Sequence, residues 1–400
     1  MSASLPSPRA LPSELRTALD ERATAGLYRR RRMVDAVDGP RVRIGGRDLI
    51  AFCSNDYLGL AGHPRLVAAW QRGAERWGVG AGAAHLVSGH TAAHQALEEE
   101  LAGFLGRPRA LLFSTGYMAN LGSVAALVGT GDRVLEDRLN HASLLDAGIG
   151  SGARFERYRH GDASDVERRL EQGSDGRRLV VSDGVFSMDG DLAPLPRLAA
   201  AAAAHGAWLM VDDAHGFGVL GAQGRGSVSH WGLDTDEVPV LMATLGKAAG
   251  TFGAFVAGAD ELVETLIQGA RTYIYTTAPP AAQAEASREA LRLLQAADEA
   301  RAHLHALIAR LRTGAGQLGI QLANSETPIQ PLLLGDAARA LRWAAALERQ
   351  GFLITAIRPP TVPRDGARLR ITLSAAHRAD DVDRLLEALV AVAREEAQHD

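Results

Sequence analysis

The stretch Trp208-Leu-Met-Val-Asp-Asp-Ala-His-Gly216 decides the fold, because it sets an apolar strand directly before two carboxylates, a histidine and a glycine. Short apolar runs that alternate with helical stretches flank it on both sides, at residues 110–113, 133–136, 179–182, 238–242 and 253–256. This alternation is typical of a largely parallel sheet that is covered on both faces. Such sheets bind ligands beyond the carboxyl ends of their strands. We therefore expect Asp212 and His215 to lie at a binding site.

The regular pattern ends at Pro279-Pro280. A long helical region at about residues 281–318 follows, and strand-like and helical segments then alternate up to residue 396. With 400 residues, of which 46% are hydrophobic, the chain is long enough to bury more than one core. We predict an α/β protein with three parts: an N-terminal helical arm at 1–45, a large domain with a mostly parallel sheet at 46–280, and a smaller α+β domain at 281–400.

The composition excludes several classes of function. Lys and Arg number 43 against 47 Asp and Glu, a net charge of −4, so we expect no nucleic-acid partner bound through its phosphates. Cys53 is the only cysteine, which excludes an intrachain disulfide and a cysteine metal cluster. The longest apolar run, at 198–211, is interrupted by His205 and Gly206 and predicts no membrane span. The first 13 residues lack the signal-peptide pattern, so we expect a cytoplasmic protein.

Lys247 is the only lysine of the chain, and every other basic side chain apart from histidine is an arginine. An amine can form a Schiff base with an aldehyde, whereas a guanidinium stays protonated and cannot. Small residues surround this lysine, in Thr244-Leu-Gly-Lys-Ala-Ala-Gly250, and they allow a cofactor to approach closely. A lysine retained by chance at the surface is the alternative. We favour a functional amine.

Asp212 and His215 allow two interpretations. In the first, both ligate a metal ion, as in a metal-dependent hydrolase. His90 and His94 have the spacing of two ligands on one helix, but no Glu follows His90 as in zinc protease motifs, so we favour helix-surface or interface histidines and predict no metal. In the second interpretation, Asp212 pairs with a cationic ring nitrogen and His215 hydrogen-bonds a ring hydroxyl.

Two further segments favour the ring ligand. In Phe113-Ser-Thr-Gly-Tyr-Met-Ala-Asn120 a predicted strand passes into a helix at Gly116, where free backbone N–H groups attract a phosphate. His141, at another strand-to-helix junction, is a candidate to stack on an aromatic ring. A phosphate at a helix start, a stacked ring, a ring nitrogen facing Asp212 and an aldehyde joined to Lys247 together describe pyridoxal 5′-phosphate (PLP).

The chain resembles the α-oxoamine synthases, PLP enzymes of the aspartate-aminotransferase-like fold, known as fold type I. The similar strings extend over about the whole chain: Ser54-Asn-Asp-Tyr-Leu-Gly-Leu60, Ser88-Gly-His-Thr-Ala-Ala-His94, Asp183-Gly-Val-Phe-Ser-Met-Asp-Gly-Asp191, Asp212-Asp-Ala-His-Gly216 and Arg358-Pro-Pro-Thr-Val-Pro363. Within the family they look most like the members of biotin biosynthesis. The resemblance implies a homodimer whose active sites are shared between its subunits.

The resemblance also implies roles for single residues. Lys247 would bind the cofactor aldehyde and later move protons, Asp212 would pair with the ring nitrogen, and His141 would stack on the ring. His215 and Ser187 would lie near the ring hydroxyl. The phosphate would be bound by Gly116, Tyr117 and Thr244, and by Thr276 or Thr277 of the neighbouring subunit. Arg358 would hold the amino-acid carboxylate, and the other substrate contacts would come from Arg29, Asn55, His141 and Thr361.

The implied reaction is the decarboxylative condensation of L-alanine with pimeloyl-CoA or a pimeloyl-acyl carrier protein. Two alternatives stay open. Another α-oxoamine synthase, such as 2-amino-3-ketobutyrate ligase, 5-aminolevulinate synthase or serine palmitoyltransferase, would use glycine or serine with a different acyl group. A metal-dependent hydrolase built on Asp212, Asp213 and His215 belongs to a different class.

Overall fold

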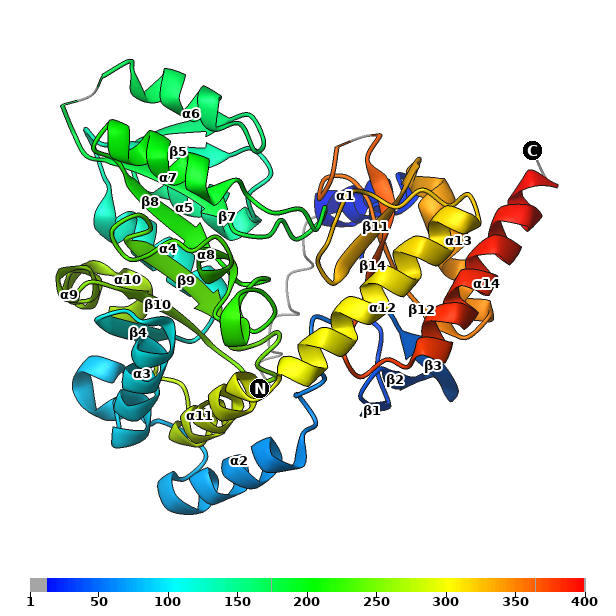
Figure 1. The fold of residues 1–400 in the computed structure, drawn as a ribbon, viewed down its shortest axis with the longest axis horizontal. Coiled ribbons are helices and arrows are strands. Elements are labelled where there is room, and N and C mark those ends of the chain that lie inside the picture. Colours follow the sequence, from blue (N-terminus) through cyan, green and yellow to red (C-terminus); the bar gives the residue numbers. More distant parts are fainter. Residues whose placement is uncertain (1–12, 174, 364, 399–400) are drawn as a thin grey trace, which may run out of the picture.

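A seven-stranded sheet forms the centre of the larger part of the molecule (Figure 1). The computed structural model describes residues 13–173, 175–363 and 365–398. In spatial order the strands are β4 (Arg109–Phe113), β10 (Ala254–Gly258), β9 (Val240–Thr244), β8 (Trp208–Asp212), β7 (Arg178–Asp183), β5 (Arg133–Asp137) and β6 (Arg154–Tyr158). Neighbours from β9 to β6 are parallel, whereas β10 is antiparallel to both β4 and β9. The expected, largely parallel sheet is confirmed.

Alternate side chains of these strands enter different apolar clusters. Met210 on β8 packs with Leu144 of α5 and Val124 of α4, whereas Leu209 and Val211 pack with the helices of the opposite face. Burial on both faces explains the continuous apolar strands in the sequence. The helices of this part are α2 (Pro64–Trp77), α3 (Ala92–Leu105), α4 (Gly116–Leu127), α5 (Ala142–Gly150), α6 (Ala163–Leu170), α7 (Leu195–Ala204), α8 (Ser227–His230), α9 (Asp260–Gly269), α10 (Arg271–Ile274) and α11 (Ala281–Gln295), with a short π-helix η1 (His85–Gly89) and a short 3-10 helix η2 (Ala222–Gly224).

The second part contains a smaller antiparallel sheet in the order β11 (Ile329–Gly335), β14 (Ala367–Thr372) and β13 (Thr355–Ile357). Its helices are α12 (Asp298–Gln317), α13 (Ala337–Arg349) and α14 (Ala379–Ala397). The helical region that we expected at 281–318 is therefore two helices, α11 and α12, and α12 leads from the large sheet to the small one (Figure 1).

The N-terminal segment differs from the expected helical arm. Of residues 1–45, the first 12 lie outside the described chain; α1 (Ser13–Thr24) is helical, and β1 (Ala36–Asp38) and β2 (Arg41–Ile44) are strands. These strands continue into β3 (Arg47–Ala51), which pairs in parallel with β12 (Phe352–Leu353). The chain therefore crosses the predicted boundary at residue 46 within one sheet, because the buried end of β3 finds its partner in the C-terminal part.

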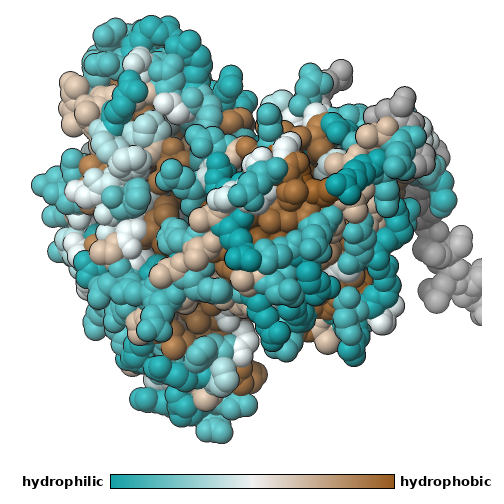
Figure 2. All heavy atoms as spheres, turned by 45° about the vertical axis from the view of Figure 1, so that its right-hand side comes forward, coloured by the Kyte–Doolittle hydropathy of each residue, from teal (hydrophilic) through white to brown (hydrophobic). Residues whose placement is uncertain are grey.

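The surface in Figure 2 is mostly hydrophilic, with a band of apolar side chains over the part of the molecule that lies on the right in Figure 1. None of the described helices combines the length and the apolar character that are needed to cross a bilayer.

Helix α2 packs unusually closely on α11 at Gly73, and this contact gives a test of the fold. A Cβ atom at Gly73 would lie 2.7 Å from Ala282 Cα, so Gly73→Ala should overpack the helix pair and destabilise the protein by about 1–3 kcal/mol. Gly103 in α3 is a matched control, because a Cβ there meets open space and Gly103→Ala should stabilise by roughly 0.5–1 kcal/mol. Denaturant unfolding of both variants measures the difference, and equal effects would contradict the close packing.

Candidate active site

The amine of Lys247 lies in the turn after β9, where it meets the turn that follows β8. Its Nζ atom is 2.9 Å from Nε2 of His215, and Nδ1 of His215 is 2.6 Å from the hydroxyl of Tyr57. His215 and Tyr57 are both buried. An ammonium group can only donate, so Nε2 accepts, and the ring proton on Nδ1 is donated to the Tyr57 oxygen. Tyr57 donates in turn to Asn55 Oδ1, 3.2 Å away, and this completes a chain of four side chains.

Burial dominates the electrostatics of this chain. It lowers the pKa of Lys247 to about 8, against the opposing charges of Asp212 and Asp183. Burial, together with the charge of Lys247, also holds the pKa of His215 well below its usual value. The pKa of Tyr57 is raised to about 12, again by burial. His215 is therefore a neutral link, and Lys247 is the group in this chain that titrates near neutral pH.

Asp212 ends β8 and is held by two donors. Asn120 Nδ2 donates to Oδ2 over 2.8 Å, and the backbone N–H of Ala214 donates to Oδ1 over 3.0 Å. Asn120 also donates to Ser143 Oγ, which lies 2.7 Å from Nδ1 of His141. The structure thus brings Asp212 and His141 into one hydrogen-bonded network, with Asn120 supplied by α4 and Ser143 by α5.

A second carboxylate, Asp183, ends β7 opposite Asp212 in the parallel register. Its Oδ2 accepts from the backbone N–H of His141 over 2.6 Å, and its own N–H donates to Asn140 Oδ1 over 3.0 Å. Burial, and then the charge of Asp212, raise the pKa of Asp183 well above its usual value, which favours a protonated Asp183. Asp183 therefore fixes the backbone at His141, whose side chain is exposed.

The start of α4 lies beside the end of β9. A Cβ atom at Gly116 would be 3.6 Å from Met242 Cε, and Thr115 caps the helix by accepting from the N–H of Met118. Thr244 accepts from the N–H of Gly246 over 3.1 Å and donates to Gly253 O over 2.9 Å. Tyr117 is exposed, and its hydroxyl donates to Asp146. The predicted phosphate residues thus flank one edge of the sheet, the edge that also carries Asp212.

Other predicted site residues have different neighbours. Arg358 donates to Gly26 O, and Thr361 follows it at the surface. Arg29 is exposed. Among the described residues, no hydrogen bond or ion pair joins these three to Lys247 or Asp212. Thr277 pairs with Ala84 in an isolated bridge, and the half-buried Thr276 precedes it.

Arg370 was not predicted as a site residue from the sequence, although its charge acts on Lys247 and on His215. Arg370 lies on β14 and is buried; it donates to Asn55 Oδ1 over 3.2 Å and to the carbonyl of Ser187 over 2.6 Å. Its charge also lowers the pKa of Lys247 and of His215. The available signal was an arginine inside an apolar strand, because buried arginines are rare unless they have partners. Four other side chains of the site have no comparable sequence pattern that would have marked them: Tyr57, Asn120, Ser143 and Asp183.

The residues present fit PLP. A buried carboxylate with two oriented donors, a half-buried amine of lowered pKa, an exposed histidine ring and a helix start all lie at one edge of the sheet. Asn120 Oδ1, next to Asp212, is a buried oxygen without a partner in the described chain. Lys247, Asp212, His141 and Gly116 are thus the residues that would hold the aldehyde, the ring nitrogen, the ring face and the phosphate.

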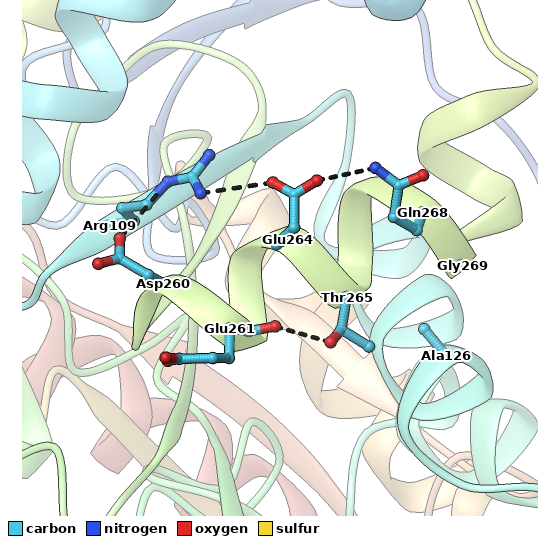
Figure 3. A pocket seen from close by; sticks show the side chains of 8 residues that line it. All are labelled: Arg109, Ala126, Asp260, Glu261, Glu264, Thr265, Gln268 and Gly269. Carbon is cyan, nitrogen blue, oxygen red and sulfur yellow. Dashed lines mark hydrogen bonds and ion pairs between the residues drawn. The ribbon is translucent and has the colours of Figure 1, made fainter.

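A separate hollow of about 720 Å³ lies over α9, at the opposite end of β4 from Gly116 (Figure 3). Its arginine, Arg109, is 3.8 Å from a carboxylate oxygen of Asp260 and 3.6 Å from one of Glu264. With Glu261, three acidic side chains line this hollow against one arginine, so its lining is acidic, and the hollow is remote from the carboxyl edge of the sheet.

Comparison with known proteins defines the class first. Residues 47–389 match the class I and II aminotransferase family. A serine palmitoyltransferase variant from S. paucimobilis, with a bound PLP–myriocin aldimine, has a TM-score of 0.91 at 30% sequence identity and covers 97% of this chain and 99% of its own. The fold is that of a PLP-dependent enzyme of fold type I.

Two further relatives share one name, which is more specific than this class. The 8-amino-7-oxononanoate synthase of Thioalkalivibrio sulfidiphilus is 63% identical over 377 residues, which is 94% of this chain and 96% of the relative. The crystal structure of the Francisella tularensis 8-amino-7-oxononanoate synthase has a TM-score of 0.76 at 32% identity and covers 87% of this chain and 99% of its own. The chain belongs to the 8-amino-7-oxononanoate synthase family.

Membership of this family shows that the metal-dependent hydrolase alternative is wrong. Asp212 and His215 have different hydrogen-bond partners, which are Asn120 for Asp212, and Lys247 and Tyr57 for His215. His94 instead bonds Pro279 O through Nε2 at 2.8 Å and accepts the N–H of Thr91 at Nδ1. Within the described ranges, no group of three or more His, Cys, Asp or Glu side chains is arranged to hold a metal ion.

The lowered pKa of Lys247 can be measured directly in the apoenzyme. As the pH rises through about 8, the amine loses its proton, so its rate of modification by an amine-directed reagent should rise with that midpoint. Because the chain has one lysine, peptide mass spectrometry can follow this site alone, with Lys247→Arg as the blank. A midpoint at the ordinary lysine value of about 10.4 would contradict the buried setting.

Proposed function

We propose that this chain condenses L-alanine with a pimeloyl thioester to give 8-amino-7-oxononanoate, CO2 and a free thiol, a step of biotin biosynthesis. The name shared by the 63% identical relatives supports these substrates. The observation that carries the chemistry is the contact of the only lysine with His215, at the edge of the sheet where Asp212 ends β8.

PLP, when bound, supplies a ring that accepts the electrons left on the α-carbon of the amino acid when a bond to that carbon breaks. Asp212 would hold the proton on the ring nitrogen, and Asn120 and the N–H of Ala214 keep its carboxylate in one orientation. His141 would cover the ring, with its backbone fixed by Asp183 and its side chain by Ser143. The phosphate would be bound by Gly116, Tyr117 and Thr244, and Ser187 and His215 would lie near the ring hydroxyl.

Lys247 is the group that removes and returns the α-proton. A base must be deprotonated to act, and with its pKa at about 8 the amine is about one-tenth neutral at pH 7, whereas an ordinary lysine is less than about 0.1% neutral. His215, itself fixed by Tyr57, orients Nζ through a hydrogen bond of 2.9 Å. Burial therefore favours the deprotonated state of the base, and the hydrogen bond with His215 sets its direction.

The amino-acid carboxylate has two candidate cations. Arg358, the predicted one, donates to Gly26 O, whereas Arg370 is buried next to Asn55 and its charge acts on Lys247. We propose that Arg370 binds the carboxylate together with Asn55, and that Arg358, Thr361 and Arg29 contact the acyl donor. A guanidinium bonded to Asn55 and Ser187 presents its remaining N–H groups in a fixed direction, which suits a planar carboxylate.

Substitution of the two arginines separates these assignments. Arg370→Lys should raise the KM for alanine by about tenfold or more, because an ammonium cannot reproduce a bidentate contact. Arg358→Lys should instead raise the KM for the acyl thioester and leave the KM for alanine near the wild-type value. Steady-state kinetics with each substrate varied in turn measures both, and a raised alanine KM in Arg358→Lys alone would reverse the assignment.

The acyl donor is tested by thiol release from a panel of thioesters. We expect turnover with alanine and a pimeloyl group, carried by coenzyme A or by an acyl carrier protein, and little with glycine or serine. Preference for serine with a palmitoyl thioester would instead favour the activity named for the S. paucimobilis neighbour.

Lys247→Ala should keep the wild-type circular dichroism spectrum and melting temperature but lose turnover, and near-normal turnover would exclude Lys247 as the base.

Assembly as a homodimer and a cytoplasmic location complete the proposal. Exposed apolar side chains gather near the bridge between Ala84 and Thr277, among them Val87 and Tyr275, which are 79% and 70% exposed. A second subunit covering them would bring Thr276 or Thr277 towards the partner's phosphate. Light scattering at micromolar concentration should give twice the mass of the chain, and a monomer that remains active would overturn the shared site.

A further inference from the structure

His160 lies just after β6, between two carboxylates. Its Nδ1 is 3.1 Å from Asp137 Oδ1, and its Nε2 is 2.8 Å from Asp191 Oδ2. The ring stands edge-on to Phe186, with centroids 4.4 Å apart. Burial disfavours the charged ring, but the hydrogen bonds to both carboxylates outweigh it and raise the pKa of His160 to about 10. Both ring nitrogens of His160 therefore donate, and it is an imidazolium at neutral pH.

One of its partners leads to His141. Asp137 ends β5, and its carboxylate also accepts from the N–H of Leu139 over 2.8 Å and from that of Gly161 over 2.8 Å. The carboxylate therefore sets the turn that begins two residues before His141. Rotation of Asp137 would move this turn, and with it the backbone that Asp183 holds.

The other partner leads to Arg370. Asp191 closes the segment 186–191, in which the N–H of Phe186 donates to Asp191 O over 3.0 Å and the N–H of Gly190 donates to Phe186 O over 2.8 Å. Ser187 lies within this segment, and its carbonyl accepts from Arg370 Nε over 2.6 Å. His160 thus anchors one end of a segment whose other end, at Ser187, is hydrogen-bonded to Arg370 in the second part of the molecule.

We propose that His160 is a positioning residue. It fixes both the His141 turn and the Ser187–Arg370 contact, although it would contact neither the cofactor nor the amino acid. This inference rests on the proposed function, because that function gives His141 and Arg370 their roles. The side chains of His160 and Asp191 are 22% and 33% exposed, and ion pairs that are partly exposed to solvent contribute little to stability. The value of a doubly bonded imidazolium here is therefore the geometry it imposes on two segments from different parts of the sheet edge.

The variant that tests this is His160→Gln, which removes the charge and one of the two hydrogen bonds. We expect the apoenzyme to bind PLP about tenfold more weakly, because a charge-assisted hydrogen bond is lost from the His141 turn. The visible circular dichroism of the bound cofactor should weaken, and the KM for alanine should rise more than kcat falls. His160→Arg keeps the positive charge and has N–H donors for both carboxylates, so it should restore most of each property.

His303→Gln is the matched control. His303 on α12 also makes a hydrogen bond through Nε2, to His377 O at 3.0 Å, but it lies in the small domain. Its loss should lower the melting temperature without changing the cofactor spectrum or the alanine KM. If His160→Gln behaves in the same way as this control, the positioning role is wrong and the residue is structural.

Asp191→Asn keeps the inference testable if His160→Gln does not fold. It removes the charge from only one side of His160, so the alanine KM should rise while PLP affinity stays closer to that of the wild type. An unchanged alanine KM would overturn the link to Arg370. PLP affinity and the cofactor spectrum are measured without an acyl donor. A failure of this inference can therefore be distinguished from a failure of the proposed function, in which the wild-type protein does not use pimeloyl thioesters.

Discussion

Two carboxylates end adjacent parallel strands, and one buried edge of a sheet cannot hold both as bare charges. Asp183 and Asp212 lie side by side in the parallel register of β7 and β8, and the other contacts of the site depend on this arrangement. Asp212 takes side-chain and backbone donors, Asp183 takes the backbone of His141, and the amine of Lys247 lies within the field of both. The site is therefore a balance of charges at a strand edge, into which a cofactor with its own ring nitrogen and phosphate fits.

Much of this could be predicted from the sequence, because the signals were local. An apolar strand was expected directly before the two carboxylates, and β8 covers Trp208–Asp212, since an apolar run followed by carboxylates admits few other interpretations. Lys247, Asp212, His215 and His141 were expected together, and the structure places them at one edge. The class and the family follow from the same strings and were confirmed by the comparisons.

What sequence alone did not predict depends on contacts between distant segments. Arg370 reaches Asn55 across 315 residues of chain, and β3 pairs with β12 from the other end of the molecule. No local pattern shows that Tyr57 bonds His215, since a tyrosine in an apolar string has many possible partners. The roles of Arg358, Thr361, Arg29, Thr276 and Thr277 stay predictions for a related reason, because their expected ligands belong to substrates or to a second subunit.

The single lysine has a consequence beyond the site. A lysine-specific endoprotease has one bond to cut, after residue 247, and that bond separates β9 from β10 in the middle of the central sheet. The two fragments would remain interlocked, because β10 of the second fragment is hydrogen-bonded on both sides to β4 and β9 of the first. The chain is thus a natural candidate for fragment complementation, in which reassembly of the halves rebuilds the sheet on which the cofactor site depends.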